Sequence, residues 1–109
     1  MRICLYWNDG AGGGFSFDDI SRLVTHAGHE IVRVVTRTAE LRPESLRSID
    51  CMVAAGGDGT VARAGRLLAG GTMPLAILPL GTANNIATSL GVDEDPRRAI
   101  AAWSLQKVV

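Results

Sequence analysis

The residues best suited to chemistry stand together where an apolar segment ends in the run Gly56-Gly57-Asp58-Gly59-Thr60. A short apolar segment that breaks into glycines is typical of a buried strand opening into a turn. We expect the two adjacent glycines to turn the backbone through positive φ and to let a ligand approach without a Cβ in the way. The helical pattern that follows would present unpaired N–H groups and the positive end of its dipole. This segment therefore predicts a phosphate-binding turn.

Asp58 is the exception in this run, because a carboxylate repels phosphate groups. A divalent cation that bridges the carboxylate and the phosphates would resolve the conflict. Mg²⁺ suits this role, since it binds through few carboxylates together with substrate phosphates. Alternatively, Asp58 turns away from the ligand and caps the helix that follows. Asp58 is thus a candidate metal ligand, with helix capping as the alternative.

Two further loops have a composition that suits a polyphosphate. They cover positions 8–14 and 79–85, and each follows an apolar segment of strand length. In a parallel sheet with right-handed crossovers, every strand-to-helix loop emerges at the carboxyl edge, where open α/β sheets bind their ligands. We therefore expect all three loops to converge on one crevice. Their hydroxyl and amide side chains, which can donate hydrogen bonds to phosphate, are those of Asn8, Thr60, Thr82, Asn84 and Asn85.

The elements that position these loops follow from the hydrophobic pattern. Apolar segments of strand length alternate with segments of helical period, which indicates an α/β fold with a mainly parallel sheet. A weak pattern after Pro43 predicts one or two helical turns, with Leu46 and Ile49 facing inward. The strands are expected at Arg2 to Trp7, Glu30 to Thr36, Asp50 to Ala55, Pro74 to Leu78, and from about Lys107 onward.

The helices have clearer boundaries than the strands. The first is amphipathic from Phe17 to Ala27 and is followed by Gly28 as its C-cap. His26 and His29 stand on either side of that glycine and are expected on the surface. Further helices are expected at Thr60 to Ala69, at Ala83 to Leu90, and after the N-cap Asp95, with Pro96 in the first turn and with Ile100 and Trp103 facing the core.

The composition is that of one globular domain. The chain has 109 residues, of which 47% are hydrophobic, and its 11 basic residues balance 11 acidic ones. Without a basic run, neither nucleic acid nor an anionic membrane is expected as an electrostatic partner. Cys4 and Cys51 lack the spacing of a zinc site or a disulfide framework, so both are expected as buried thiols. No signal peptide or membrane span is recognisable, and the default location is cytoplasmic.

Two common nucleotide motifs do not fit this sequence. The pattern GxxxxGK[ST] is absent, and positions 10–15 have Phe15 where GxGxxG needs its last glycine. The second strand also lacks the acidic residue that a dinucleotide fold carries at its end. A different class of nucleotide site is therefore expected.

The run from Gly56 to Thr60, together with the segment Pro79-Leu80-Gly81-Thr82-Ala83-Asn84-Asn85, resembles the catalytic domain of diacylglycerol kinases and related lipid kinases. Positions 8–12 are similar to the opening loop of that family. The resemblance covers the chain from Asn8 onward. It implies a three-layer α/β sandwich, similar in fold to NAD kinases and phosphofructokinases, in which residues 1–109 form the ATP-binding domain. A second, β-sandwich domain, which this chain lacks, would supply the lipid site and the general base.

The resemblance also implies roles for individual residues. Asp58 would act with Mg²⁺ or near the reacting phosphate, as the catalytic and metal-binding residue. Arg63 stands where the family often has glutamate, and it could reach a phosphate instead. Asp9, Asn85 and Thr88 are further departures, because they replace a usual proline, a frequent aspartate and a frequent arginine. The implied nucleotide-binding residues are Asn8, Asp9, Gly10, Ala11, Gly12, Thr36, Gly56, Gly57, Asp58, Gly59, Thr60, Arg63, Gly81, Thr82, Asn84 and Asn85.

The function that the resemblance implies is transfer of the ATP γ-phosphate to a hydroxyl of diacylglycerol or a similar lipid. NAD kinase is one alternative, although that family has Gly-Ile-Asn in the third loop, where this chain has Gly81-Thr82-Ala83-Asn84. A nucleotide-binding module without catalysis, or a truncated pseudoenzyme, is another. The lipid would be reached through the second domain, which would place the full-length protein at the membrane surface, and a homodimer is left open.

Overall fold

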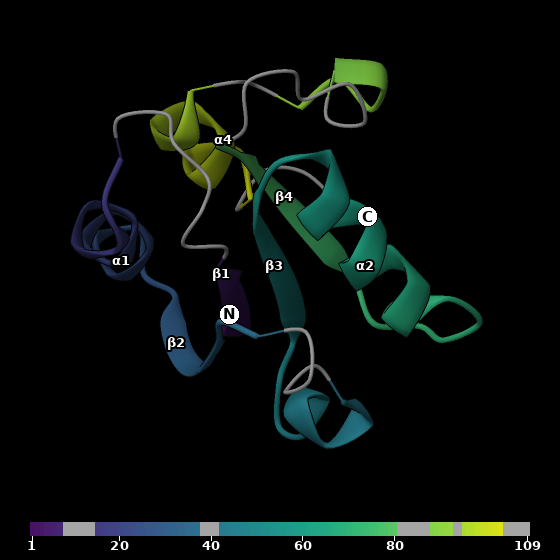
Figure 1. Ribbon diagram of the computed structural model, residues 1–109. Helices are drawn as coiled ribbons and strands as arrows, with labels where there is room; N and C mark the ends of the chain where they lie inside the picture. Colours follow the sequence, from purple (N-terminus) through teal and green to yellow (C-terminus); the bar gives the residue numbers. More distant parts are fainter. Residues whose placement is uncertain (8–14, 38–41, 81–87, 93–94, 104–109) are drawn as a thin grey trace.

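The sheet is parallel throughout, as the alternation of elements predicts. The structure is a computed structural model that describes residues 1–7, 15–37, 42–80, 88–92 and 95–103 (Figure 1). The strands of this part are hydrogen-bonded in the order β2-β1-β3-β4, and all three strand pairs are parallel. Crossover connections join β1 to β2 and β3 to β4, whereas the connection from β2 to β3 passes over β1. The strands are β1 (Arg2–Trp7), β2 (Glu30–Val35), β3 (Cys51–Gly56) and β4 (Leu75–Pro79).

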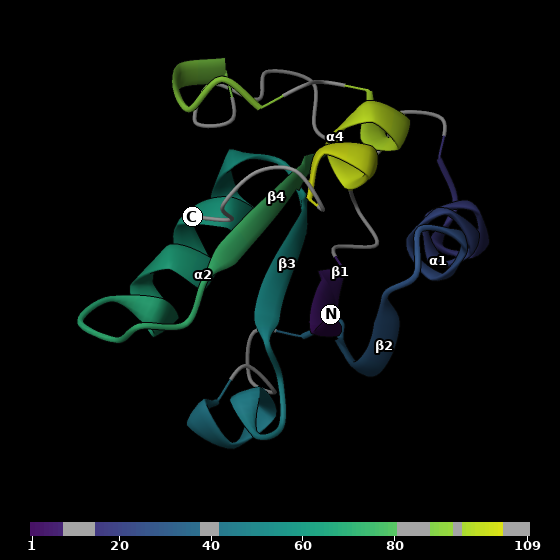
Figure 2. The same cartoon turned by 180° about the vertical axis from the view of Figure 1, so that it is seen from behind.

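Helices cover both faces of the sheet and make three layers. Helix α2 lies in front of β3 and β4 in Figure 1, and the reverse view in Figure 2 brings α4 to the front, with α1 beside it. A short 3₁₀ turn precedes β3, on the same side of the sheet as α2. No helix in the described ranges is long and apolar enough to cross a membrane. The bounds are α1 (Phe17–His26), the 3₁₀ turn (Pro43–Leu46), α2 (Asp58–Leu68) and α4 (Pro96–Ala102).

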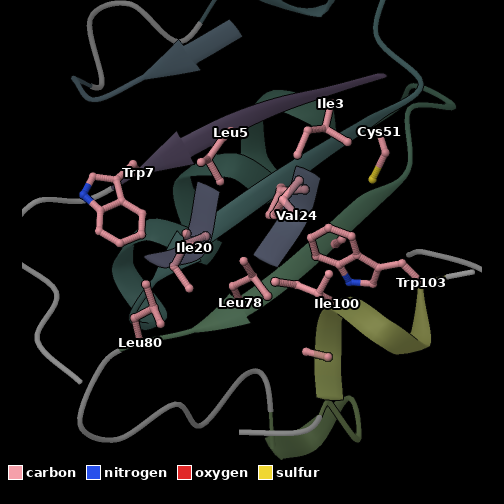
Figure 3. Packing of buried hydrophobic residues seen from close by; sticks show 14 residues of the cluster. Ile3, Leu5, Trp7, Ile20, Val24, Cys51, Leu78, Leu80, Ile100 and Trp103 are labelled. Carbon is pink, nitrogen blue, oxygen red and sulfur yellow. The ribbon is translucent and has the colours of Figure 1, made fainter. Parts of the chain in front are cut away.

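Alternating residues of β1 divide the interior into two cores. Ile3, Leu5 and Trp7 point toward α1 and α4, whereas Cys4 and Tyr6 point toward α2. All five side chains are at most 5% exposed. Figure 3 shows the first core, where the side chains of α1 and α4 meet those of the strands. Its largest members are Ile3, Leu5, Trp7, Ile20, Val24, Leu78, Leu80, Ile100 and Trp103.

Most element boundaries agree with the sequence prediction to within one residue. The predicted capping of α4 is confirmed, since the Asp95 side chain accepts a hydrogen bond of 2.9 Å from the Arg97 backbone N–H. The inward positions of Leu46 and Ile49 are confirmed, and so are the buried thiols of Cys4 and Cys51. The fifth strand and most of the helix expected at 83–90 lie outside the described residues.

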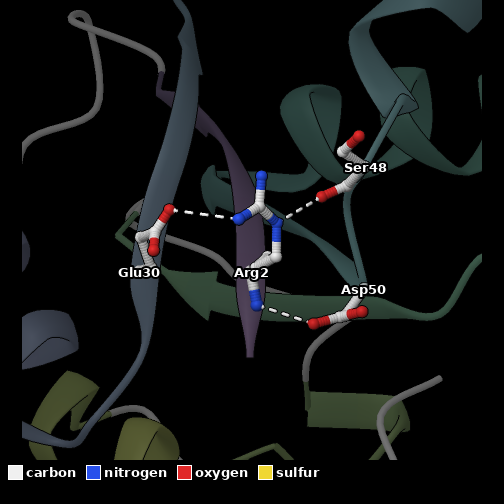
Figure 4. A network of polar contacts seen from close by, with 4 residues as sticks. All are labelled: Arg2, Glu30, Ser48 and Asp50. Carbon is white, nitrogen blue, oxygen red and sulfur yellow. Dashed lines mark hydrogen bonds and ion pairs between the residues drawn. The ribbon is translucent and has the colours of Figure 1, made fainter.

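A polar network holds the amino ends of three strands together. The Arg2 side chain donates a hydrogen bond of 2.8 Å from Nε to the Ser48 carbonyl oxygen, and its Nη1 lies 3.5 Å from a Glu30 carboxylate oxygen (Figure 4). The Arg2 backbone N–H also donates to the Asp50 carboxylate at 2.8 Å. Because these groups are exposed, each contact contributes little by itself. The network nevertheless fixes β2 and the turn before β3 against the start of β1, at the end of the sheet away from the predicted crevice.

The expectation for His29 is wrong, because this side chain is buried. It is 9% exposed, its Nδ1 lies 3.0 Å from the Met1 amino group, and its ring centroid lies 5.4 Å from that of Trp103. His26 is exposed, as expected. The chain turns inward after α1 through Gly28, at φ +93°. Burial, and then the positive charge of the amino terminus, lower the pKa of His29.

Lowering the pH is expected to destabilise the fold through His29. The unfolded chain, with a histidine pKa near 6.5, takes up the proton more readily than the folded chain, in which the pKa of His29 is lowered. The stability contributed by neutral His29 is therefore present above about pH 6.5 and is lost as the pH falls toward the folded pKa. Urea unfolding between about pH 7.5 and pH 5.5 measures this loss.

Two asparagine variants test this prediction: His29→Asn, and His26→Asn as its matched control. His29→Asn keeps an acceptor near the Met1 amine but does not titrate, so the free energy of unfolding should depend less on pH than in the wild type. His26→Asn changes an exposed side chain and should follow the wild type. If the wild type and His29→Asn showed the same pH dependence, His29 would not be the titrating group.

Candidate functional site

The strands that precede the three predicted loops end side by side. Trp7 at the end of β1 pairs with Ala55 of β3, and Gly56 pairs with Pro79 at the end of β4. The Leu80 backbone N–H also donates a 3.0 Å hydrogen bond to the Gly56 carbonyl oxygen. The three loops therefore start from adjacent positions at the carboxyl edge of the sheet.

Much of the predicted site belongs to loops outside the described residues. Their binding roles stay predictions, although the strands that lead into both loops are described. The predicted site residues in these two loops are Asn8, Asp9, Gly10, Ala11, Gly12, Gly81, Thr82, Asn84 and Asn85.

The turn after β3 differs from the expectation in its backbone. Among the described glycines, positive φ occurs at Gly28, Gly70 and Gly91, and not at Gly56 or Gly57. Gly57 is extended, with φ −91° and ψ −168°. The predicted passage through positive φ at this turn is therefore wrong, and the need for glycine there has another cause.

That cause is the side chain of Thr60. A Cβ added to Gly56 would lie 2.6 Å from Thr60 Oγ1 and 2.9 Å from Thr60 Cβ, closer than real Cβ atoms approach their neighbours. Thr60 is 1% exposed, so its side chain fills the space beside Gly56 beneath the turn. Gly56 thus lets the first turn of α2 pack directly against the end of β3. The predicted nucleotide contact of Thr60 stays a prediction.

Helix α2 begins two residues earlier than the sequence predicts. Gly57 is its N-cap, without a side-chain capping bond, and Asp58 is the first helical residue. The alternative in which Asp58 caps the helix is therefore wrong. A carboxylate in the first turn of a helix is favoured by the helix dipole. Asp58 is partly exposed at the carboxyl edge, where a metal or phosphate could reach it.

Arg63 is held near the same turn. Its Nε donates a 3.1 Å hydrogen bond to the hydroxyl of Tyr6, a β1 residue that is 2% exposed. Its Nη1 and Nη2 lie 3.6 Å and 3.9 Å from the place of a Cβ added to Gly59. The guanidinium group therefore lies along the amino-terminal part of α2, toward which helical side chains point.

Thr36 lies at the same edge but farther along the sheet. It is exposed and follows directly after β2, the outer neighbour of β1. Because β1 stands between β2 and β3, Thr36 lies beside the end of β1 and not beside the turn after β3. Tyr6 is the residue at this edge that the sequence prediction missed. The available signal was the alternation in β1, which places Tyr6 on the α2 side, one residue before the last residue of the strand.

No three His, Cys, Asp or Glu side chains in the described ranges gather in a way that could hold a metal ion. A site for Mg²⁺ built from one carboxylate and substrate phosphates does not need such a cluster. The hard carboxylate oxygens of Asp58, placed beside a predicted phosphate site, fit that kind of coordination.

The sequence and fold are similar to those of known kinases. The chain is 37% identical over 84 residues to "Probable lipid kinase YegS-like" from Klebsiella pneumoniae (strain 342), covering 75% of this chain and 26% of the relative. It is 34% identical over 87 residues to "Diacylglycerol kinase" from Mycobacterium tuberculosis (strain CDC 1551 / Oshkosh), covering 75% of this chain and 28% of the relative. The chain thus spans about a quarter of the length of these relatives.

A solved structure agrees with the fold. The crystal structure of a diacylglycerol kinase from Bacillus anthracis str. Sterne matches with a TM-score of 0.74 and 25% identity, over 95% of this chain and 39% of that one. The family model described as "Diacylglycerol kinase catalytic domain" matches residues 4–108, which is nearly the whole chain. The chain therefore belongs to the diacylglycerol kinase catalytic domain family.

Proposed function

We propose that this chain is the ATP-binding part of a lipid kinase, which transfers the γ-phosphate of ATP to a hydroxyl of diacylglycerol or a similar lipid. The observation that carries the proposal is the start of α2 at Asp58, directly beyond the end of β3, in a chain that matches the kinase family. This start places the helix dipole and the first-turn N–H groups at the carboxyl edge. The names of the relatives favour a lipid kinase over a NAD kinase.

The described residues fit a phosphate chain in three ways. The backbone N–H groups at the start of α2 would bind phosphate oxygens, and Arg63 would add positive charge beside them. Asp58 would hold Mg²⁺, which when bound neutralises phosphate charge. Phosphoryl transfer depends mainly on positioning and on stabilisation of charge, and these groups supply both. The loops at 8–14 and 81–87 would complete the nucleotide site.

The acceptor lipid belongs to a different part of the proposed enzyme. We place the ATP-binding domain in residues 1–109, and the lipid site and general base in a second domain. The share of the relatives that the chain spans, 26% and 28%, supports this division. Contact with a membrane surface would accordingly lie outside these residues.

Isothermal titration of the purified chain with Mg·ATP tests the nucleotide site. We expect binding with a Kd below about 1 mM, and weaker binding when Mg²⁺ is removed by a chelator. Circular dichroism establishes that the sample is folded. The proposal would be contradicted if the folded chain showed no binding of ATP at millimolar concentration. In the intact protein, phosphorylation of NAD in place of diacylglycerol would contradict the lipid as the acceptor.

A further inference from the structure

Tyr6 and Arg63 form a link between the end of β1 and the start of α2. Tyr6 is 2% exposed and packs in the core beneath α2 together with Val61 and Ala64. Its hydroxyl oxygen accepts the 3.1 Å hydrogen bond from Arg63 Nε, although the two residues are 57 positions apart in the sequence. A buried phenol with a polar partner at this place ties the guanidinium to the sheet.

The orientation of this guanidinium is informative. With Nε directed to Tyr6, the two terminal nitrogens are the ones that lie nearest Gly59, in the first turn of α2. A guanidinium carries four N–H donors on its terminal nitrogens, in a planar arrangement that matches two oxygens of a phosphate. Gly59 has no side chain to fill the space on this side of the helix. The paired donors of Arg63 are thus held beside the turn that bears Asp58.

The charge at this turn explains why such a group is useful. The Asp58 carboxylate and a phosphate chain repel each other, and a fixed cation nearby offsets this repulsion. A free arginine side chain would lose much rotational freedom on binding a phosphate, whereas one already held at Nε loses less. Fixing the side chain in advance therefore increases the affinity that the same charge provides.

We infer that Tyr6 is a positioning residue for anion binding: it holds Arg63 so that its terminal nitrogens bind the phosphate chain of the ligand at the first turn of α2. This inference rests on the proposed nucleotide site and adds to it the residue that orients the guanidinium of Arg63. The ligand chemistry that the pair recognises is a polyphosphate, whether free or as part of a nucleotide.

A double-mutant cycle with Tyr6→Phe and Arg63→Gln tests the inference. The probes are inorganic tripolyphosphate, ATP and adenosine, each titrated calorimetrically against the whole chain. Arg63→Gln should lower the affinity for tripolyphosphate and ATP about tenfold or more. Tyr6→Phe should lower the same affinities about threefold to tenfold. Adenosine affinity should not change in either variant. The double variant should bind like Arg63→Gln alone, because Tyr6 acts through Arg63.

Two further variants separate positioning from a structural role. Arg66→Gln removes an exposed arginine from the last turn of α2 and should leave tripolyphosphate affinity unchanged. Arg63→Lys should restore part of the tripolyphosphate affinity that is lost in Arg63→Gln. The affinity of the Arg63→Lys variant should not change when Tyr6→Phe is added. If Tyr6→Phe fails to fold, wild-type affinity in both Arg63→Lys and Arg63→Gln would still overturn the inference.

The outcomes distinguish this inference from the proposed function. A wild type that binds ATP, with Tyr6→Phe and Arg63→Gln unchanged, overturns the inference and leaves the nucleotide site standing. Additive losses in the double variant also overturn the role of Tyr6. Binding of tripolyphosphate with the expected coupling, but without binding of ATP, supports the inference and contradicts the nucleotide site. A wild type that binds neither probe overturns both.

Discussion

Replacing Asp58 by asparagine is expected to lower the kcat of the intact protein by about a hundredfold to a thousandfold, as for loss of a group that stabilises charge in a transition state. Asparagine keeps the shape of the side chain but removes the charge that would hold Mg²⁺ beside the phosphates. It also removes a favourable interaction with the dipole of α2, so stability should fall by up to about 1 kcal/mol. Steady-state kinetics with varied Mg²⁺ and urea unfolding measure the two effects.

Asp18→Asn is the matched control. Asp18 stands in the first turn of α1, where it also interacts with a helix dipole, but α1 covers the opposite face of the sheet. The two variants should therefore lose similar stability, while activity falls in Asp58→Asn alone. Retained turnover in Asp58→Asn would rule out the catalytic and metal-binding role.

Replacing Gly56 by alanine is expected to destabilise the chain by about 1–3 kcal/mol and to weaken ATP binding about tenfold or more, because a methyl group is forced into an occupied space. The new Cβ would lie 2.6 Å from Thr60 Oγ1, and Gly56 is itself buried, so α2 must move away from β3. Movement of the helix would displace the whole first turn, including Asp58. Urea unfolding and calorimetric titration measure both losses.

Two glycines of α2 serve as controls for this substitution. A Cβ on Gly59 would lie 3.6 Å from Arg63 Nη1, an ordinary contact, so Gly59→Ala should fold normally. Gly65 has nothing within 4 Å of an added Cβ, and Gly65→Ala should gain about 0.5–1 kcal/mol of stability and keep its affinity for ATP. Unchanged stability and binding in Gly56→Ala would contradict the packing role of Gly56.

The sheet could be predicted well because most of its strands can be recognised from the local sequence pattern. Strands β1, β3 and β4 are short, mostly buried apolar runs bounded by turn residues, and a buried parallel strand needs little more. The start of α2 was missed by two residues because Gly57, Asp58 and Gly59 are poor helix formers. Packing of Thr60 against Gly56 overrides that preference, and propensity carries no information about such packing.

The site was predicted less completely because its contacts are remote in sequence. Arg63 could be named from its position after the glycine run, but its tie to Tyr6 spans 57 residues. The burial of His29 likewise depends on Met1 and on Trp103, which no local pattern connects to it. The adjacency of the ends of β1, β3 and β4 was accessible from topology alone, because parallel strands bring their carboxyl ends together.

The network around Arg2 has a practical consequence for engineering. It lies at the amino ends of the strands, and β1, which runs for six residues from Arg2 to Trp7, spans about 17–20 Å at the usual rise per residue. That span is about twice the screening length of physiological salt. Surface charges around Arg2 can therefore be redesigned for solubility or thermal tolerance while the electrostatic potential at the first turn of α2 stays nearly constant.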